Sequence, residues 1–454
     1  MNLTRLRALA VFLALATGAV SPALSQEPFV PPPAGQRLTL DHAIELALAG
    51  NEISGIAAAR LEGAAALKRQ AVAQLIPALT VTANATRRAR EVTRIIGGDE
   101  VTVQAVHAYS SQAAVDTPLF DLRALPLIRA AQSGLAAQRI ESQELRRALA
   151  FDVADGYYAA LSLERLLDAA RQRVVVGTQT VAESRIRLDA GLANRNDLTR
   201  TELELATAEL VATRAANSVT TARLALSFLI NAPVDGELAV PKRSTLQNAG
   251  RQDLVDQALA ARQELTALDE RLRQAKRLAL APRLGWVPRF DLRGIYRWTN
   301  EAGLSGSSED WNIGANLTWE LFDGGDRTSF AAQRDAEAKE VELVLAQRRR
   351  QVALEVDRSS ADLASADAAL SQARTQLDVA IQNAEEVRER FQNGLATALE
   401  QTDAQVSAFE SEAEVARQGF ARDVAGLALE RALGGWPAGD DPYYSQRSSL
   451  PEAP

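Results

Sequence analysis

The sequence predicts a mainly α-helical protein with a smaller β part, built from two copies of one structural plan. Three observations support this prediction. Apolar residues recur with helical spacing over two long stretches, residues 123–188 and 326–391. Before each stretch come segments in which apolar and polar residues alternate, a pattern typical of β-strands. The same order of elements occurs twice along the chain of 454 residues.

The first 25 residues are typical of a secretory signal peptide. Arg5 and Arg7 precede an apolar stretch, residues 8–20, and the small-residue segment 23–25 forms the cleavage site. A membrane-spanning helix needs roughly 20 apolar residues, so the shorter stretch favours a cleaved signal over a retained anchor. A proline-rich, extended leader is predicted for residues 26–37.

The composition limits how the exported chain attaches to a membrane and what it binds. The chain has no cysteine, so it has neither disulfides nor a lipid-modified cysteine. No apolar run after residue 25 reaches the length of a transmembrane helix, which leaves a soluble protein or a β-barrel component. The formal charge of -8 and the low aromatic content, 5%, give no support to nucleic-acid binding.

Matching short motifs mark the two repeats. Leu119-Phe120-Asp121 corresponds to Leu321-Phe322-Asp323, and Gly191-Leu192-Ala193 corresponds to Gly394-Leu395-Ala396. Each repeat is predicted to contain a helix, a β-hairpin, a long helix, a tip and a return helix. The predicted bounds are 38–230 for the first repeat (hairpin 78–119, long helix 123–188, tip 189–196) and 251–434 for the second (hairpin 286–322, long helix 326–391, tip 392–397), with a linker at 231–250 and a flexible tail at 435–454.

The shorter helices are predicted to stack end to end beside the long ones. Residues 253–281 and 397–433 together are as long as the second long helix. In the first repeat, residues 39–75 and 196–229 together roughly match the first long helix. The second long helix also carries a heptad seam of apolar residues. Its members are Leu363, Ala366, Leu370, Ala373, Leu377, Ala380, Ala384 and Val387. The helices alone favour an ordinary periplasmic coiled-coil bundle.

The strands favour a membrane location. Residues 79–86 and 311–321 alternate apolar and polar side chains, as lipid-facing barrel strands do. A small β-sandwich with one dry face also explains the alternation. Four of the five tryptophans, however, lie in or beside the second hairpin, and Trp and Tyr gather at membrane interfaces. The predicted interface aromatics are Trp286, Tyr296, Trp298, Trp311 and Trp319.

The number of strands predicts an oligomer if the sheet lies in lipid. Four strands per chain cannot close around a lumen, since the smallest closed barrels have about eight. An open sheet edge in hydrocarbon is prohibitively costly. Two, three or more copies must therefore pool their hairpins.

With its elements in this order, the chain resembles the TolC family of outer-membrane efflux proteins. The resemblance covers roughly residues 38–434 and includes "LFDGG" (321–325) and "FQNGLATALEQTDAQ" (391–405). It implies a homotrimer with a 12-stranded transmembrane β-barrel, four strands per chain, continuous with a long α-helical barrel in the periplasm. It also implies a passive exit channel in the outer membrane of a Gram-negative bacterium, without a cofactor.

The resemblance implies partners and a gate at the two tips. A periplasmic adaptor, bound in turn to an inner-membrane transporter, would dock on Gly191, Leu192, Ala193, Gly394, Leu395 and Ala396. In the family, acidic residues six and nine positions after the second glycine ring the entrance, and Glu400 and Asp403 hold these positions. Asp197 matches a position that helps to close the entrance. Phe391 replaces the tyrosine that the family's gate uses, so no hydroxyl is available there.

The same acidic residues have a plain structural interpretation. Thr397 and Glu400 fit a capping box, and Asp197 can cap the first return helix. Capping does not account for Asp403, which lies three residues after Glu400 on the same helical face.

No constellation of residues predicts an enzyme or a metal site. His42 and His107 have no cysteine partners and no ligand spacing, and no phosphate-binding loop or nucleophile motif occurs. The alternative to an exit channel is a periplasmic coiled-coil adaptor or tether without a membrane barrel. An adaptor has one helical hairpin flanked by β-rich domains, whereas this chain has two hairpins.

Overall fold

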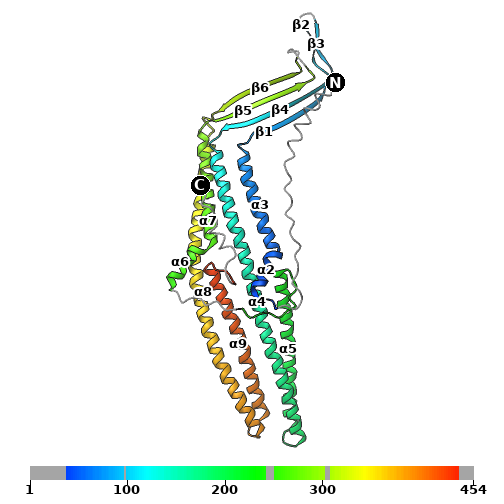
Figure 1. Cartoon of the computed structure of the whole chain (residues 1–454), viewed down its shortest axis with the longest axis vertical. Coiled ribbons are helices and arrows are strands. Elements are labelled where there is room, and N and C mark those ends of the chain that lie inside the picture. The colour runs from blue at the N-terminus through cyan, green and yellow to red at the C-terminus, as the bar shows by residue number, and fades with distance from the viewer. Residues whose placement is uncertain (1–36, 97–98, 242–249, 302–306, 439–454) are drawn as a thin grey trace.

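Two helices of nearly equal length form the frame of the molecule (Figure 1). Helix α4 runs Ala124–Asp189 with 66 residues, and helix α8 runs Asp326–Gln392 with 67 residues. Each is about 100 Å long at ~1.5 Å per residue. They occupy the ranges predicted for the two long helices.

The computed structural model describes residues 37–96, 99–241, 250–301 and 307–438. The predicted signal peptide lies outside the described residues. So do all of the leader but residue 37, most of the second half of the linker, and the tail from residue 439.

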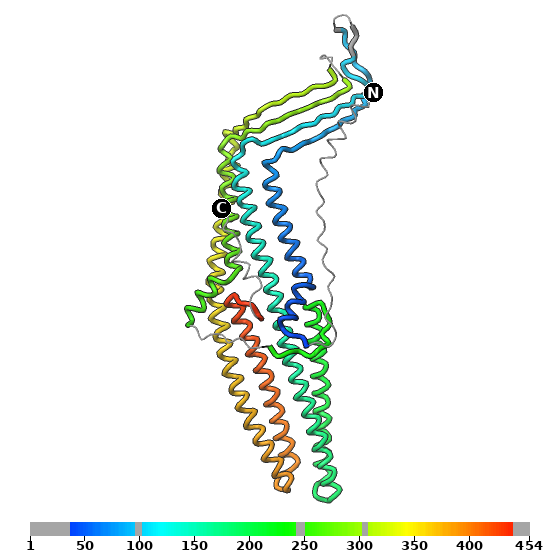
Figure 2. Tube along the Cα trace, viewed as in Figure 1, coloured from blue at the N-terminus to red at the C-terminus, as the bar shows by residue number. Residues whose placement is uncertain are grey.

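Shorter helices pack beside each long helix, one above the other. Helices α3 (Glu52–Ala73) and α5 (Arg195–Ile230) contact α4 at different heights. Helices α7 (Gln263–Arg283) and α9 (Ala398–Ala432) do the same along α8. The Cα trace shows this end-to-end arrangement and the two hairpin tips side by side (Figure 2). All eight residues of the predicted heptad seam on α8 are buried or half-buried.

Two predicted helices are each broken in the structure. The range 39–75 contains α2 (Leu40–Gly50) and α3, and the range 253–281 contains α6 (Arg251–Ala261) and α7. The prediction of single helices there was wrong. Asn51 adopts an extended conformation, accepts a hydrogen bond from the backbone N–H of Ile53 and donates one to the carbonyl oxygen of Leu229. These contacts replace the helical bonds at the break.

One hairpin from each repeat joins a single antiparallel sheet. The strands are β1 (Ala78–Arg87), β4 (His107–Phe120), β5 (Arg289–Thr299) and β6 (Glu309–Thr318), in the order β1-β4-β5-β6. The register places apolar residues opposite apolar residues on one face and polar residues opposite polar residues on the other. Leu79 lies opposite Val115, and Tyr296 lies opposite Trp311, on the apolar face. Asp116 lies opposite Arg293 on the polar face, with Nε and Oδ1 3.2 Å apart.

The loop of the first hairpin contains a second, smaller sheet. Strands β2 (Val92–Ile96) and β3 (Asp99–Gln104) pair within a segment that the sequence had indicated only as a long loop. The base of this small sheet is joined to the hairpin of the second repeat, because the carboxylate of Glu301 accepts hydrogen bonds from Arg88 and from the N–H of Ala105. Among the described residues, no helix has both the length and the apolar character needed to cross a bilayer.

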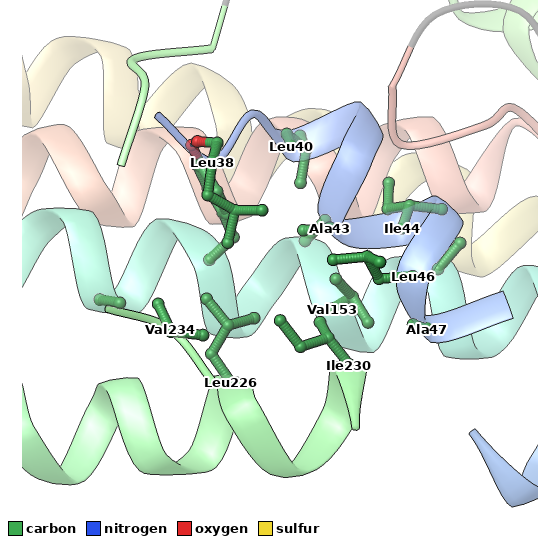
Figure 3. Packing of buried hydrophobic residues seen from close by; sticks show 14 of the residues in the cluster. Leu38, Leu40, Ala43, Ile44, Leu46, Ala47, Val153, Leu226, Ile230 and Val234 are labelled. Atoms are coloured by element: carbon green, nitrogen blue, oxygen red, sulfur yellow. The ribbon is translucent and has the colours of Figure 1, made fainter. Parts of the chain in front are cut away.

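A belt of packed side chains surrounds the middle of α4. Helix α2, the end of α5 and the segment after it bury a cluster that includes Ile44, Val153 and Leu226 (Figure 3). Tyr157 is fully buried there, and its hydroxyl lies 2.6 Å from the carbonyl oxygens of both Leu38 and Ala239. One side chain therefore holds the start of the first repeat and the linker against α4.

A second belt holds the elements around α8. The side chain of Arg262, only 6% exposed, lies at the break between α6 and α7. Its Nη1 atom is 2.6 Å from a carboxylate oxygen of Glu264 and 2.6 Å from one of Glu355, and its Nε donates to the carbonyl oxygen of Ala432 at 2.9 Å. Arg348 bonds the other oxygens of both carboxylates at 2.9 Å. This network connects α7, α8 and the end of α9.

Candidate functional site at the helical tips

The two tips have the same backbone geometry. Gly191 and Gly394 have φ angles of 75° and 74°. In the first tip the N–H of Leu192 donates to the carbonyl oxygen of Arg187 at 2.8 Å, and in the second that of Leu395 donates to Arg390 at 2.7 Å. This is the Schellman ending of a helix, which places glycine in the left-handed conformation. Each turn leaves its leucine largely exposed, at 78% for Leu192 and 71% for Leu395.

Both return helices begin with a capping box. In α5 the N–H of Asp197 donates to Asn194 Oδ1 at 3.0 Å, and the N–H of Asn194 donates to Asp197 Oδ2 at 3.2 Å. In α9 the N–H of Thr397 donates to Glu400 Oε2 at 2.7 Å, and the N–H of Glu400 donates to Thr397 Oγ1 at 3.2 Å. The capping interpretation of Asp197 and Glu400 is thus correct in this structure.

Glu400 and Asp403 differ in how their carboxylates are used. Hydrogen bonds from the backbone and hydroxyl of Thr397 hold the pKa of the Glu400 carboxyl below its usual value. Asp403 is exposed and makes no hydrogen bond or ion pair with the described part of the chain. The Glu400 carboxyl is therefore charged near neutral pH and bound to its own helix start, whereas the Asp403 side chain is left without a partner in the described part of the chain. Their role in a gate stays a prediction.

Arg187 joins the two tips, a contact that no pattern in the sequence predicted. Its Nη2 atom donates to the carbonyl oxygens of Phe391 at 2.5 Å and Gln392 at 3.2 Å. The guanidinium carbon lies 3.9 Å from the centre of the Phe391 ring, a cation–π contact. A cation on the last carbonyls of α8 also complements the helix dipole. Phe391 lacks a hydroxyl, yet it still contributes to a contact between the tips.

The predicted interface aromatics lie at both ends of the β5–β6 pair. Trp286 ends a short 3-10 turn, Leu284–Trp286, just before β5, and Trp319 follows β6. The indole N–H of Trp319 donates to the carbonyl oxygen of Trp286 at 3.1 Å. Tyr296 and Trp298 lie near the far end of β5, close to Trp311 at the start of β6. All five are exposed, so the sheet carries an exposed aromatic band at each end of this strand pair; their place at a membrane interface stays a prediction.

The sheet has two open edges. Strands β1 and β6 are its outer strands, each pairs on one side only, and every residue of both is exposed. An unpaired edge of ten residues is a template for pairing with another chain.

Comparison with known proteins gives a family for this arrangement. The sequence profile of the "Outer membrane efflux protein" family matches residues 43–232 and 254–435, one segment in each repeat. Outer membrane protein OprJ of Pseudomonas aeruginosa is 25% identical over 413 residues, which cover 87% of this chain and 84% of OprJ. The family is one of efflux proteins rather than of enzymes.

Solved structures share the fold. The outer membrane protein VceC of Vibrio cholerae superposes with a TM-score of 0.73 at 21% identity, over 87% of this chain and 96% of VceC. The open state of the MtrE outer membrane channel of Neisseria gonorrhoeae gives a TM-score of 0.74 at 21% identity, over 88% of this chain and 90% of MtrE. The chain belongs to the outer membrane efflux protein family, as its sequence resemblance predicted, and is an outer-membrane protein of a Gram-negative bacterium.

Proposed function

We propose that this chain is the exit channel of a tripartite efflux or type I secretion system. It forms a passive conduit from the periplasm to the exterior, gated at its helical tips. The observation that carries the proposal is the four-stranded sheet with one apolar face, two aromatic bands and two open edges, set at the end of the long helices. An adaptor or tether without a barrel gives no reason for these features.

The open edges support a homotrimer. Pairing β6 of one copy with β1 of the next satisfies both edges, and three copies form a 12-stranded barrel. The apolar face then meets lipid and the polar face lines the lumen. The long helices of the three chains continue this barrel into the periplasm.

In such a trimer the acidic tip forms the gate. Three copies of Glu400 and Asp403 bring six carboxylates to one opening, where they attract cations and repel anions. Asp197 holds the neighbouring tip in place through its cap. The exposed turns around Leu192 and Leu395 offer apolar contacts to a periplasmic adaptor, which links the channel to an inner-membrane transporter.

The experiment that tests the gate is single-channel recording in planar bilayers. The double variant Glu400→Gln with Asp403→Asn removes both charges, while Gln at the third helical position still completes the capping box. We expect block by a multivalent cation on the periplasmic side to weaken at least about tenfold, since the bound ion loses its charged ligands. The matched control, Glu410→Gln with Asp378→Asn, removes two exposed acids farther along the helices. Equal block in both double variants would exclude the gate role.

Membrane location is tested separately. We expect a heat-resistant oligomer in the outer-membrane fraction. A soluble monomer in the periplasm would favour the adaptor alternative instead.

A further inference from the structure

We propose that a cavity between the two helical hairpins of the chain binds a small organic cation with an apolar body. The hairpins are α4 with α5 and α8 with α9, which run side by side (Figure 2). The cavity lies within a single chain, between the tips and the belts. The inference goes beyond the proposed function, because a passive channel needs no ligand site of this kind in order to conduct.

The cavity has a volume of about 330 Å³ and is lined by residues of all four helices. Small-molecule sites in proteins span ~300–1,000 Å³, so a compact organic molecule has room here. Several of the lining residues have small side chains or none, and they come from both hairpins: Ala169, Gly177, Ala208, Ala384 and Ala408. The space therefore arises where α9 packs against α4 with little side-chain volume between them.

The larger side chains in the cavity are apolar. They are Val176 of α4, Leu377 and Ile381 of α8, and Phe409 of α9. The first two and Phe409 are half-buried, and Ile381 is 42% exposed, so the chain itself does not cover them fully. A ligand that removes such apolar surface from water is favoured by the hydrophobic effect. The interior of the cavity therefore selects a ligand with an apolar body.

The charges that line the cavity do not balance. Three glutamates and two arginines take part, which are Glu204, Glu385, Glu412, Arg173 and Arg388. Arg173 of α4 and Glu204 of α5 pair with each other. The guanidinium carbon of Arg173 also lies 4.7 Å from the centre of the Phe409 ring. The other three charged side chains make no hydrogen bond or ion pair with the described residues.

The three unpaired side chains lie at the mouth of the cavity, since all of them are exposed. Glu385 and Arg388 are about one turn apart on α8, and Glu412 lies on α9. Two carboxylates and one guanidinium leave a net charge of -1 at the mouth. This charge attracts a single positive charge on a ligand and repels an anion. The apolar interior and the acidic mouth together match an amphipathic, monovalent cation.

Two hydrophobic ions of nearly the same size and shape provide the test. Tetraphenylphosphonium is a cation, whereas tetraphenylborate is an anion with the same phenyl groups. With the full protein in lipid nanodiscs, equilibrium dialysis measures the saturable binding of each ion above that of empty nanodiscs. We expect tetraphenylphosphonium to occupy one site per chain. Tetraphenylborate should bind this site at least about tenfold more weakly, because the mouth of the cavity repels it. Equal saturable binding of the two ions, or none of the cation, would overturn the proposal.

Charge variants at the mouth should act in opposite directions. Glu385→Gln with Glu412→Gln removes both unpaired carboxylates and should weaken binding of tetraphenylphosphonium about tenfold. Arg388→Gln removes the unpaired positive charge and should strengthen it about threefold. The control is Glu386→Gln, one residue from Glu385, because this side chain is 72% exposed and does not line the cavity. It should leave binding unchanged. A site that responds to none of the mouth charges, or equally to Glu386→Gln, would contradict the assigned cation.

A variant that fills the space tests the cavity without changing any charge. Ala384→Phe places a ring in the cavity and should abolish saturable binding of tetraphenylphosphonium. The control is Ala364→Phe, at an exposed position of the same helix outside the cavity, which should bind as the parent does. The thermal unfolding midpoint shows that each variant is folded. A folded Ala384→Phe variant with parental binding would overturn the site. None of these measurements depends on conduction, so failure of the proposed function would leave their outcome unchanged.

Discussion

The second belt, around α8, and the helical tips use the same kinds of contact, but the charged groups of the belt have more partners than those of the tips. In the belt, Arg262 is buried among two carboxylates, a second arginine and a carbonyl oxygen, so that each charge has several partners. At the tips, Arg187 joins the two hairpins by hydrogen bonds to the carbonyl oxygens of Phe391 and Gln392, and Asp403 has no partner within the described chain. The belt is therefore a fixed point of the fold, and the tips are a place where small changes in energy shift the structure.

This difference suggests how the long helices transmit motion. Helix α4 passes through the first belt and helix α8 through the second, and both helices continue without a break to the tips. A helix that is fixed at mid-length and free at its end bends or rotates chiefly below the fixed point. Variants in the belt should therefore change stability, and variants at the tips should change gating.

The largest effect is expected from the buried arginine of the belt. Arg262→Met leaves Glu264 and Glu355 near each other with one arginine fewer, and removal of one partner from a buried ion pair costs about 3–5 kcal/mol. We expect a clear fall in the midpoint of thermal unfolding in detergent. The matched control is Arg251→Met, because Arg251 pairs with Asp357 of the same helix α8 but is 78% exposed. Its midpoint should stay close to that of the parent protein, because water screens an exposed ion pair. Equal losses in the two variants would contradict the distinction between belt and surface.

A smaller loss is expected from the tyrosine of the first belt. Burial raises the pKa of the Tyr157 hydroxyl above its usual value, so this group remains a hydrogen-bond donor at all ordinary pH values. Tyr157→Phe removes the donor shared by Leu38 and Ala239 and should cost about 1–3 kcal/mol of unfolding free energy. Tyr109→Phe, at an exposed tyrosine of β4, is the control and should lie within ~0.5 kcal/mol of the parent. A neutral Tyr157→Phe would mean that packing alone holds the linker.

The sequence predicted those features of the fold that depend on residues close to one another in the chain. The Schellman turns need a glycine, Gly191 or Gly394, just after the end of a helix, and each capping box needs an acid three residues after the cap. The residues that form each of these features therefore lie close together in the sequence. The alternation of the strands likewise indicated which face of each is apolar, and the register confirms it.

The missed features depend on partners far along the chain. The break at Asn51 is held by the carbonyl oxygen of Leu229, 178 residues later, and that at Arg262 by Ala432, 170 residues later. Arg187 reaches Phe391, 204 residues later. Each of these side chains sits in an ordinary helical pattern, and only the packing of the two repeats reveals its role.

The third prediction compares the two caps. Asn194→Ala and Thr397→Ala each remove the side chain that accepts the backbone N–H of the third residue of a return helix, at a cost of about 1 kcal/mol of local stability. Amide hydrogen exchange should therefore quicken in the first turn of α5 or α9, respectively. The acids of the proposed gate, Glu400 and Asp403, both lie at the start of α9, so only Thr397→Ala should also raise the open probability. A rise with Asn194→Ala as well would show that both tips gate equally.

The smallest effect concerns pH at the second tip. A carboxyl whose pKa is lower in the folded than in the unfolded protein stabilises the fold at pH values above the unfolded pKa, ~4.3 for glutamate. That stability is lost as the pH falls through the lower, folded value. The cap of α9 should therefore weaken only in acid, with a carboxyl carbon resonance of Glu400 that titrates below the normal range.

Asp403 provides the check on this titration. If the carboxylates of three chains crowd one opening, their repulsion raises the pKa of Glu400 against the effect of Thr397. Asp403→Asn should then lower the pKa of Glu400 further, whereas Asp378→Asn, at an exposed position outside the tip, should not change it. An unchanged Glu400 titration in Asp403→Asn would mean that the acids stand apart. In that case Glu400 would act as a helix cap alone, and the two tips would differ in sequence but not in function.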